Sequence, residues 1–319
     1  MLRLLCSCVV ATSVAAIGAA QPRGFGAPAP AAGALEAAKQ RARVAGHDVL
    51  LIFTGPEWCS WSRRLAAEVL GTAEFRDALP ERFVPVMLEF ARDATSTPAE
   101  HVRLRQEYAV QGLPTVVLAD ADGRPYARLG YRRGGADAYV QHLDRLRLRR
   151  VRRDRAWAAA AAALGQTRAG LLAQGLGEID AAARCHYIDV MREIVALAAV
   201  GSPLHPLWRG RLEQVESDLA VDRERERFRQ RAAAGEWRAA AAGVGTFLRD
   251  AGRPSRRGEL HYLHGVALAE IGAWRPAVAA LRSAVTADPT LIARVRAVLE
   301  RIEASTASGG DALDFTLRP

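Results

Sequence analysis

The feature that most constrains this fold is a strand-like run that passes through a short turn directly into a helix-like run. Residues 49–53 form an unbroken apolar stretch, which is typical of a central strand covered on both faces. A Thr-Gly-Pro turn at 54–56 ends it, and the apolar residues of 60–70 then recur at helical spacing. A strand buried on both sides needs helices packed over it, so this part of the chain is predicted to be α/β.

Further strand and helix signals surround this unit. A helix-like stretch precedes it, and apolar runs, a second helix and a hairpin with an Asp-Gly turn follow it. The predicted elements are strands over 48–53, 83–90, 115–118 and 124–131, and helices over 34–45, 60–70, 99–110 and 136–148. We expect residues 34–148 to form one α/β domain with the hairpin at a sheet edge.

Strand signals end with that domain. Residues 145–155 contain seven arginines in eleven positions, a run typical of a solvated helix face or a connection between domains. An acidic partner or anionic lipid headgroups are further interpretations of the run. We interpret residues 149–155 as an Arg-rich linker. Residues 156–304 follow the helical period alone, which predicts an all-α domain, and residues 305–319 are expected to be a disordered tail.

An internal repeat stands out in the helical half. Gly-Glu-Trp-Arg-Ala-Ala at 235–240 recurs as Gly-Ala-Trp-Arg-Pro-Ala at 272–277, which is 37 residues later. Small and apolar residues around the later copy have the spacing of a tetratricopeptide repeat, which residues 258–291 resemble. These residues are Gly265, Leu268, Gly272, Ala277, Leu281, Ala284 and Pro289. The resemblance implies a surface for a protein partner, and an ordinary pair of helical hairpins is the alternative.

The N-terminus has the pattern of a secretory signal peptide. Residues 1–20 contain one early arginine and an apolar stretch that ends in small residues, and the Pro/Gly/Ala-rich residues 21–33 are expected to be a flexible tether. Removal of the signal leaves two cysteines, Cys59 and Cys185. We therefore expect an exported protein, periplasmic or extracellular, with a retained signal anchor as the alternative. No later segment has the apolar length needed to span a membrane.

The charge of the chain does not indicate a nucleic-acid partner. The net charge of +9 comes almost entirely from arginine, because Lys39 is the only lysine. Together with abundant alanine, this bias is typical of genome composition rather than of a phosphate-binding surface. His261 and His264 lie three residues apart, but within the repeat packing or exposure explains them better than zinc. We expect no metal and no cofactor.

The motif Trp58-Cys59-Ser60-Trp61-Ser62 stands between the turn and the predicted helix. A thiolate is the reactive form of cysteine, and unpaired backbone N–H groups at a helix N-terminus lower a thiol pKa to about 3.5–7.5. Ser62 lies three residues after the cysteine and is expected to turn its hydroxyl toward the sulfur. Arg63 and Arg64 add favourable charge. The pattern therefore predicts a nucleophilic Cys59 assisted by Ser62.

With these residues in view, residues 34–148 resemble the thioredoxin superfamily, especially exported members with a Trp-Cys-x-Trp-Cys motif. The resemblance implies thiol-disulfide exchange on protein substrates. It places Trp58 and Trp61 beside the nucleophile, Pro114 as the cis-proline opposite the active site, and Leu113 as the residue whose backbone pairs with an extended substrate. The substrate-binding residues implied are thus Trp58, Trp61, Leu113 and Pro114.

Two departures weaken the usual reductase function. Ser62 occupies the position of the resolving cysteine and cannot attack a mixed disulfide. Phe53, six residues before Cys59, stands where the family has a buried acid that handles the proton of the resolving thiol. The loss of both groups is mutually consistent, so dithiol reductase activity is not expected.

Two hypotheses for the function follow. The first is an exported monothiol protein that engages protein disulfides or thiols through Cys59, either as an isomerase or by exchange with a small thiol such as glutathione. The second is a non-catalytic scaffold, in which the repeat-bearing helices bind a protein partner and the thioredoxin-like fold is redox-inactive, with Cys59 a structural residue.

Overall fold

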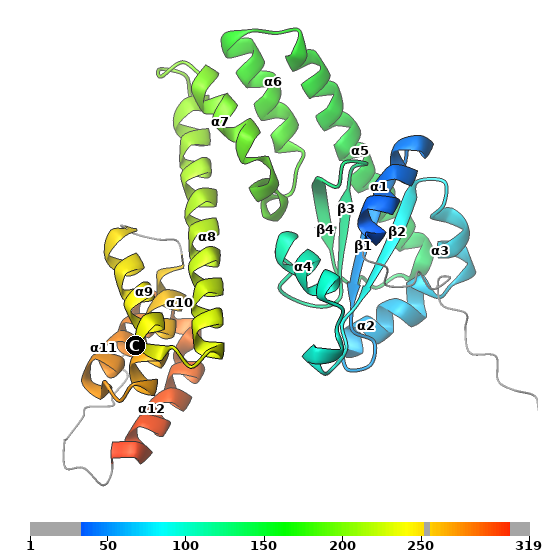
Figure 1. Ribbon diagram of the computed structural model, residues 1–319. Coiled ribbons are helices and arrows are strands. Elements are labelled where there is room, and N and C mark those ends of the chain that lie inside the picture. The colour runs from blue at the N-terminus through cyan, green and yellow to red at the C-terminus, as the bar shows by residue number, and fades with distance from the viewer. Residues whose placement is uncertain (1–32, 252–255, 307–319) are drawn as a thin grey trace, which may run out of the picture. The chain divides into compact units, whose positions relative to one another are not determined.

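The structure is a computed structural model that describes residues 33–251 and 256–306. The expected signal peptide, the tether up to residue 32 and the tail from residue 307 onward lie outside the described residues. The chain divides into two compact units, with the boundary between Leu148 and Arg149 (Figure 1). Each unit is described by itself.

The first unit is built around a four-stranded sheet with the order β2-β1-β3-β4. Strand β1 (Asp48–Thr54) pairs in parallel with β2 (Phe83–Glu89) and antiparallel with β3 (Thr115–Ala119), which pairs antiparallel with β4 (Pro125–Leu129). Every residue of β1 is buried. The α/β prediction for this part of the chain is therefore confirmed.

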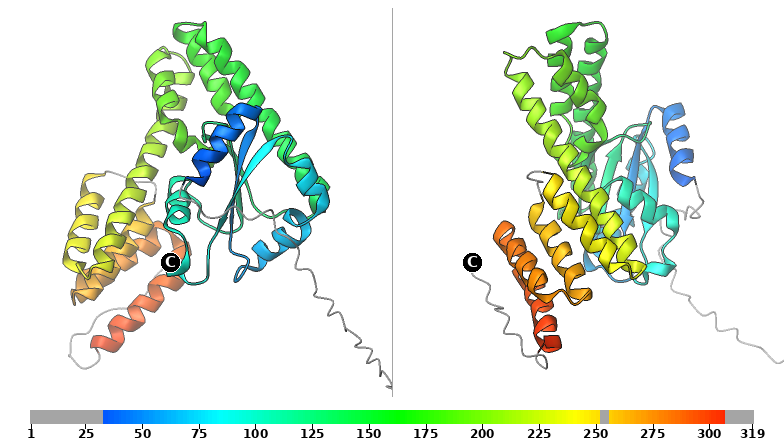
Figure 2. Two further views of the ribbon diagram at one scale, coloured as in Figure 1. Left: turned by 45° about the vertical axis from the view of Figure 1, so that its right-hand side comes forward. Right: turned by 60° about the vertical axis from the view of Figure 1, so that its left-hand side comes forward.

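Helices cover both faces of this sheet (Figures 1 and 2). They are α1 (Ala34–Ala45), α2 (Ser60–Leu65) with its π-helical continuation (Ala66–Leu70), α3 (Ala73–Ala78), a 3-10 turn (Ala94–Ser96), α4 (Ala99–Glu107) and α5 (Gly135–Ala161). Side chains of β1 alternate between two cores: Leu50 and Ile52 join the core under α2, α3 and α5, whereas Leu51 and Phe53 join the core under α1 and α4.

The arginine run, which the sequence analysis interpreted as a linker or a solvated helix face, is part of a helix. Helix α5 continues through the run to Ala161 without a break. Its guanidinium groups form ion pairs with carboxylates of the same helix and of a later segment. A guanidinium nitrogen of Arg149 lies 2.6 Å from a carboxylate oxygen of Asp180, and one of Arg150 lies 2.6 Å from a carboxylate oxygen of Asp154. Because these ion pairs offset the repulsion between neighbouring arginines, the helix persists where composition alone indicated a connection.

The second unit is helical throughout its described residues, which confirms the all-α prediction. After the end of α5 it contains α6 (Gly165–Gly177), a 3-10 helix (Ala181–Tyr187), α7 (Ile188–Leu197), α8 (Leu204–Ala233), α9 (Trp237–Asp250), α10 (Arg257–Glu270), α11 (Trp274–Ala287), a 3-10 turn (Pro289–Leu291) and α12 (Ile292–Thr306). Ser305 and Thr306, which the sequence analysis assigned to the tail, belong to α12 and donate to backbone carbonyls one turn earlier.

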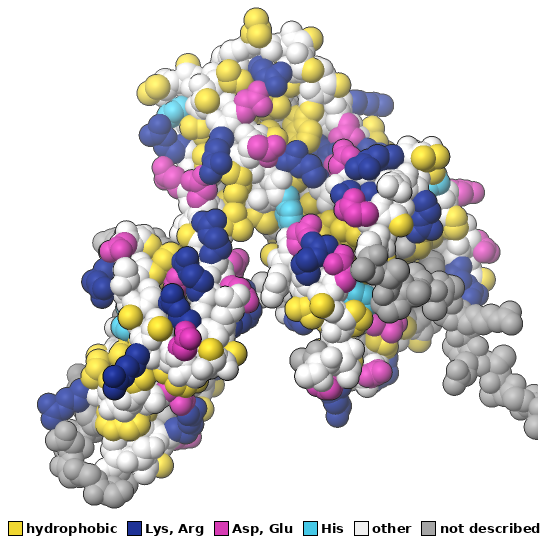
Figure 3. Space-filling view, in the orientation of Figure 1, with side chains coloured by type: hydrophobic (Ala, Val, Ile, Leu, Met, Phe, Trp, Pro, Cys, Tyr) yellow, Lys and Arg dark blue, Asp and Glu magenta, His cyan; other side chains and the backbone are white. Residues whose placement is uncertain are grey.

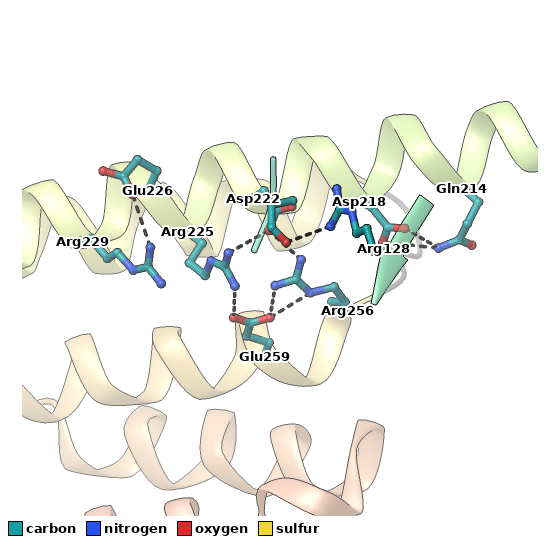
Figure 4. Close-up of polar contacts among 10 residues, drawn as sticks. Arg128, Gln214, Asp218, Asp222, Arg225, Glu226, Arg229, Arg256 and Glu259 are labelled. Carbon is teal, nitrogen blue, oxygen red and sulfur yellow. Dashed lines mark hydrogen bonds and ion pairs between the residues drawn. The ribbon is translucent and has the colours of Figure 1, made fainter. Parts of the chain in front are cut away.

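An ion-pair network joins α8 to the start of α10 (Figure 4). Asp222 of α8 lies 2.6 Å from the guanidinium of Arg256, and Arg225 of α8 lies 3.3 Å from Glu259. Arg256 also donates to Glu259, so the four charges form one continuous set. Elsewhere on the face shown in Figure 3, basic and acidic side chains are interspersed.

The two copies of the sequence repeat fold in the same way. Gly235 and Gly272 both have a φ of 74°, and each stands two positions after the end of a helix. In each copy the amide of the tryptophan two positions later donates to the glycine carbonyl, at 2.9 Å for Trp237 and 3.0 Å for Trp274. A left-handed φ at this point favours glycine in both turns. The repeat is therefore structural as well as sequential.

Helices α10 and α11 pack closely at one of the small residues singled out from the sequence. A Cβ atom at Gly265 would lie 2.6 Å from Cγ of Leu281 and 3.2 Å from the carbonyl oxygen of Ala277. No side chain larger than hydrogen fits there without displacement. Over the described ranges, none of the helices has the length and apolarity to cross a bilayer.

Candidate active site at Cys59

Cys59 lies where strand β1 leads into helix α2. It is the N-cap residue of α2, with extended backbone angles. The amides of Trp58 and Cys59 both donate to the carbonyl of Gly55, at 3.3 and 2.8 Å, and the carbonyl of Cys59 accepts from the amide of Arg63 at 3.1 Å. These bonds fix the turn, so the half-buried thiol is presented at the first turn of the helix.

The loop that precedes β3 faces the thiol. The Sγ atom of Cys59 lies 3.3 Å from the carbonyl oxygen of Leu113, to which it donates. The Leu113–Pro114 peptide bond is cis, and Pro114 is buried. Two residues distant in sequence from the motif, Leu113 and Pro114, are thus placed next to Cys59 in the fold.

Ser62, the last residue of the motif, is buried. Its side chain is fully inaccessible, and its Oγ accepts a hydrogen bond from the amide of Gly55 at 3.1 Å. With the oxygen used as an acceptor by Gly55, the hydroxyl hydrogen remains to be donated to the sulfur of Cys59. The serine is therefore held as a hydrogen-bond donor to the thiolate.

The pKa of the Cys59 thiol is lowered. Partial burial on its own raises this pKa, but hydrogen bonds from the Ser62 hydroxyl and from the amides of Ser62 and Trp61 favour the thiolate, as does the charge of Arg63. The donors outweigh the loss of solvation. A lowered pKa favours the thiolate, which is the reactive form of cysteine.

Trp58 is anchored at one edge of the site. Its indole Nε1 donates to the carbonyl of Phe90 at 2.9 Å. The ring lies against Gly55, where a Cβ atom would approach it to 2.9 Å. With its orientation fixed by these two contacts, the indole is still 39% exposed. Gly55 is therefore required for the position of Trp58.

Trp61 stands on the first turn of α2 and is 49% exposed. Its ring packs against Tyr131, with centroids 5.6 Å apart, and the guanidinium of Arg64 lies 5.2 Å from its centroid. The hydroxyl of Tyr131 donates to Glu68. Tyr131 was missed by the sequence analysis as a site residue. Its only signal was a place at the end of the predicted hairpin strand, which the fold brings beside α2.

No acid occupies the buried position behind the thiol. Phe53 is fully buried among apolar rings, 6.3 Å from both Phe90 and Tyr108. A buried carboxylate does occur on β1, but at the start of the strand: Asp48 accepts from the hydroxyl of Tyr126 at 2.9 Å and lies 3.3 Å from the guanidinium of Arg147. Asp48 is thus engaged in packing β1 against β4 and α5.

The remaining candidates from the sequence lie outside this site. Cys185 lies half-buried on the 3-10 helix before α7, and neither Cys185 nor Cys59 is in a disulfide. His261 and His264 both lie on α10, where burial lowers the pKa of each imidazole. In the part of the chain that the structure describes, no three His, Cys, Asp or Glu side chains gather as a metal would require.

The comparisons with known proteins fall on the first unit. A family model for a thioredoxin-like domain matches residues 35–146. The disulfide bond reductase DsbH of Chlamydia pneumoniae is 33% identical over 99 residues, which cover 30% of this chain and 59% of that protein. The match thus spans less than two thirds of the relative.

Two solved structures are also similar to this chain. A DsbH oxidoreductase shares 29% identity, covering 33% of this chain and 76% of that chain, with a TM-score of 0.31. The C-terminal domain of Neisseria meningitidis DsbD, in its oxidised form, shares 26% identity, covering 34% of this chain and 90% of that chain, with a TM-score of 0.28. With its matched family and its sheet topology, the segment from residue 35 to residue 146 is a thioredoxin-like domain, followed by a helical region.

Proposed function

We propose that this protein is a monothiol thioredoxin-like protein that engages protein disulfides or thiols through Cys59. The observation that carries the proposal is the placement of Ser62. It fills the position of a resolving thiol, is fully buried, and has its oxygen held by the amide of Gly55. It therefore supports the thiolate of Cys59 but has no sulfur with which to release a bound substrate.

The chemistry that follows begins with one thiol-disulfide exchange. The Cys59 thiolate attacks one sulfur of a substrate disulfide, an S–S bond forms between Cys59 and that sulfur, and the other substrate sulfur leaves as a thiolate with the electron pair of the broken bond. The mixed disulfide then persists until a second thiolate attacks it. That thiolate comes from the substrate itself, which completes an isomerisation, or from a small thiol such as glutathione.

The similarity to a protein named as a disulfide bond reductase supports thiol-disulfide chemistry in general. The lowered pKa of Cys59 and its position beside the carbonyl of Leu113 support a reactive thiol in particular. We also propose that the protein is exported to a periplasmic or extracellular location, on the basis of the signal-like pattern in residues 1–20. No cofactor enters this chemistry.

A second candidate function is favoured by the repeated turns of the helical unit. The shared backbone at Gly235 and Gly272, and the close approach at Gly265, fit tetratricopeptide-like helices that hold a protein partner. In this alternative the protein is a scaffold, and its interactions do not depend on Cys59. The two functions differ in the expected effect of removing the Cys59 thiol: it abolishes the adducts of a monothiol protein but leaves the interactions of a scaffold intact.

Trapping of mixed disulfides tests the proposal. Cells that produce the protein are quenched in acid, alkylated, and analysed without reductant. We expect a ladder of adducts that collapses when reductant is added and is absent from Cys59→Ser. The matched control, Cys185→Ser, should keep the ladder. An unmodified monomer in wild-type samples, together with partner capture that survives in Cys59→Ser, would favour the scaffold instead.

A further inference from the structure

Two exposed indoles, Trp58 and Trp61, flank the reactive thiol in the sequence. Among the large hydrophobic side chains that the described residues expose, Trp58 and Trp61 are the only aromatic ones. Aromatic side chains are usually drawn into cores or interfaces, because burying them contributes much of the free energy of folding and binding. Their exposure next to Cys59 indicates that a partner covers them when the thiol reacts.

The wall formed by Trp61, Arg64, Glu68 and Tyr131 is organised before any partner arrives. Trp61 packs on Tyr131 and lies under Arg64, and the hydroxyl of Tyr131 is bonded to Glu68. The hydroxyl of Tyr131 thus has a partner within the wall, and Trp61 remains 49% exposed. Binding to such a surface needs little ordering of side chains, so contact with it contributes directly to affinity.

The wall also carries positive charge. Arg64 lies over Trp61, and the exposed residues Arg132 and Arg133 directly follow Tyr131 in the chain. The hydrogen bond to Glu68 raises the pKa of Tyr131, whereas the charges of Arg64 and Arg133 lower it, so both arginines act on this hydroxyl.

Acidic groups also lie near the thiol. Glu57 is exposed on the turn before Cys59, and Glu68 accepts from Tyr131. Arg63 donates to the carbonyls of Pro56 and Glu57 but keeps its own charge. At the wall itself, Arg64 and Arg133 both act on the Tyr131 hydroxyl, and Glu68 is the carboxylate that accepts from it.

From this arrangement we propose that the protein clients of Cys59 present their cysteine in a segment that carries an aromatic residue and an acidic residue beside it. The aromatic residue packs on Trp61 and Tyr131, and the carboxylate is attracted by Arg64 and Arg133. This inference rests on the proposed monothiol function and names the class of substrate that it takes. Basic segments are disfavoured by the same charges.

Peptide disulfides of defined sequence test the inference on the full chain. Each peptide contains one cysteine, activated as a mixed disulfide with thionitrobenzoate, so that release of the coloured thiolate reports the exchange. The flanking residues are Phe and Asp, Phe and Lys, Ser and Asp, or Ser and Lys. Every rate constant is divided by that for hydroxyethyl disulfide, an uncharged reference, so that differences in the thiolate fraction of Cys59 cancel.

We expect the Phe-Asp peptide to react about tenfold faster than the Ser-Lys peptide, a difference of about 1.4 kcal/mol in the barrier. The part due to Asp should shrink at high salt, because the charges are exposed. Trp61→Ala should remove the preference for Phe, and Arg64→Glu combined with Arg133→Glu should reverse the preference for Asp. Arg41→Glu, a single charge reversal of the same kind on α1, should leave both preferences unchanged.

The outcomes separate the substrate class from the function itself. If the four peptides react at equal relative rates, the inference is overturned while the monothiol function stands. If glutathione disulfide reacts faster than the Phe-Asp peptide, and Arg64→Glu removes that advantage, the site selects a small anionic disulfide and the inference is again wrong. If no peptide reacts at Cys59, the proposed function itself fails.

Discussion

The amide of Gly55 donates to the hydroxyl oxygen of Ser62 across 3.1 Å, where the serine is fully buried behind Cys59. This bond decides what the serine does, because an oxygen that already accepts from an amide directs its own hydrogen elsewhere. The group that benefits is the sulfur of Cys59, whose pKa the Ser62 hydroxyl helps to lower. The residue that replaces a resolving thiol thus supports the remaining one.

Removal of the Ser62 hydroxyl should raise the pKa of Cys59. In Ser62→Ala the thiolate loses one donor while partial burial still opposes ionisation, so the midpoint of the alkylation rate moves to higher pH. At a pH below the wild-type midpoint, the rate should fall roughly tenfold for each pKa unit gained. Iodoacetamide kinetics from pH 4 to 10 measure this midpoint. Ser60→Ala, which removes an exposed hydroxyl one residue after the thiol, should not move it.

Conversion of Ser62 to cysteine should restore release of the substrate from the mixed disulfide at Cys59. The introduced thiol takes the place of the hydroxyl that is buried beside Cys59, so Ser62→Cys should resolve mixed disulfides internally and leave Cys59 in a disulfide with the introduced thiol. Trapped adducts should therefore disappear from acid-quenched samples. An undiminished ladder in this variant would show that persistence of the adducts has a cause other than the absent thiol.

The lowered pKa of Cys59 also predicts a pH dependence of stability. The folded thiol ionises at lower pH than the unfolded one, so its contribution to stability is present above the unfolded pKa of about 8.5 and is lost as pH falls through the folded value. Relative to Cys59→Ser, the reduced wild-type protein should therefore gain stability between about pH 5 and pH 9. Denaturant midpoints at the two pH values, measured under reductant, check the sign.

Close packing at Gly265 predicts a loss of stability on adding one methyl group. Gly265→Ala places a Cβ atom against Leu281 and the carbonyl of Ala277, which should cost about 1–3 kcal/mol. The matched control is Gly210→Ala in α8, where nothing lies within 4 Å of the added atom and the gain in helix propensity should be about 0.5–1 kcal/mol. Urea unfolding of both variants gives the comparison, and equal effects would contradict the packing of α10 on α11.

Arg153 is the buried residue of the arginine run, and we expect its removal to destabilise the fold. Its guanidinium donates to the hydroxyl of Tyr187 at 2.8 Å and lies 4.9 Å from the ring centroid of Trp157. Arg153→Ala removes both contacts from a buried site and should cost about 3 kcal/mol. Arg155→Ala, on an exposed part of the same helix, should stay within about 0.5 kcal/mol of wild type in thermal unfolding.

The sequence predicted most of the local structure, because apolar period, turns and the motif around Cys59 are local signals. Strand β1 and the start of α2 fall where the pattern placed them. Contacts between residues far apart in the chain could not be predicted from these local signals. The packing of Trp61 on Tyr131 joins two residues far apart in the chain, and it depends on the strand order of the sheet.

The arginine run shows a second limit of the sequence analysis. A run of like charges indicates a solvated or connecting segment only when its counterions are unknown. Asp180 and Glu178, which pair with Arg149 and Arg152, lie on a later turn that no local pattern connects with the run. The continuation of α5 through residues 149–155 therefore could not be predicted from local sequence patterns, because it depends on ion pairs that form only in the folded protein.

Mass spectrometry of the intact, reduced protein after reaction with a peptide disulfide tests the central claim most directly. We expect one peptide on Cys59, in an adduct that persists after the free disulfide is removed and is released only by added thiol. Cys185→Ser should form the same adduct and Cys59→Ser should not. An adduct that resolves without added thiol, or the absence of any adduct on Cys59, would contradict monothiol chemistry at this site.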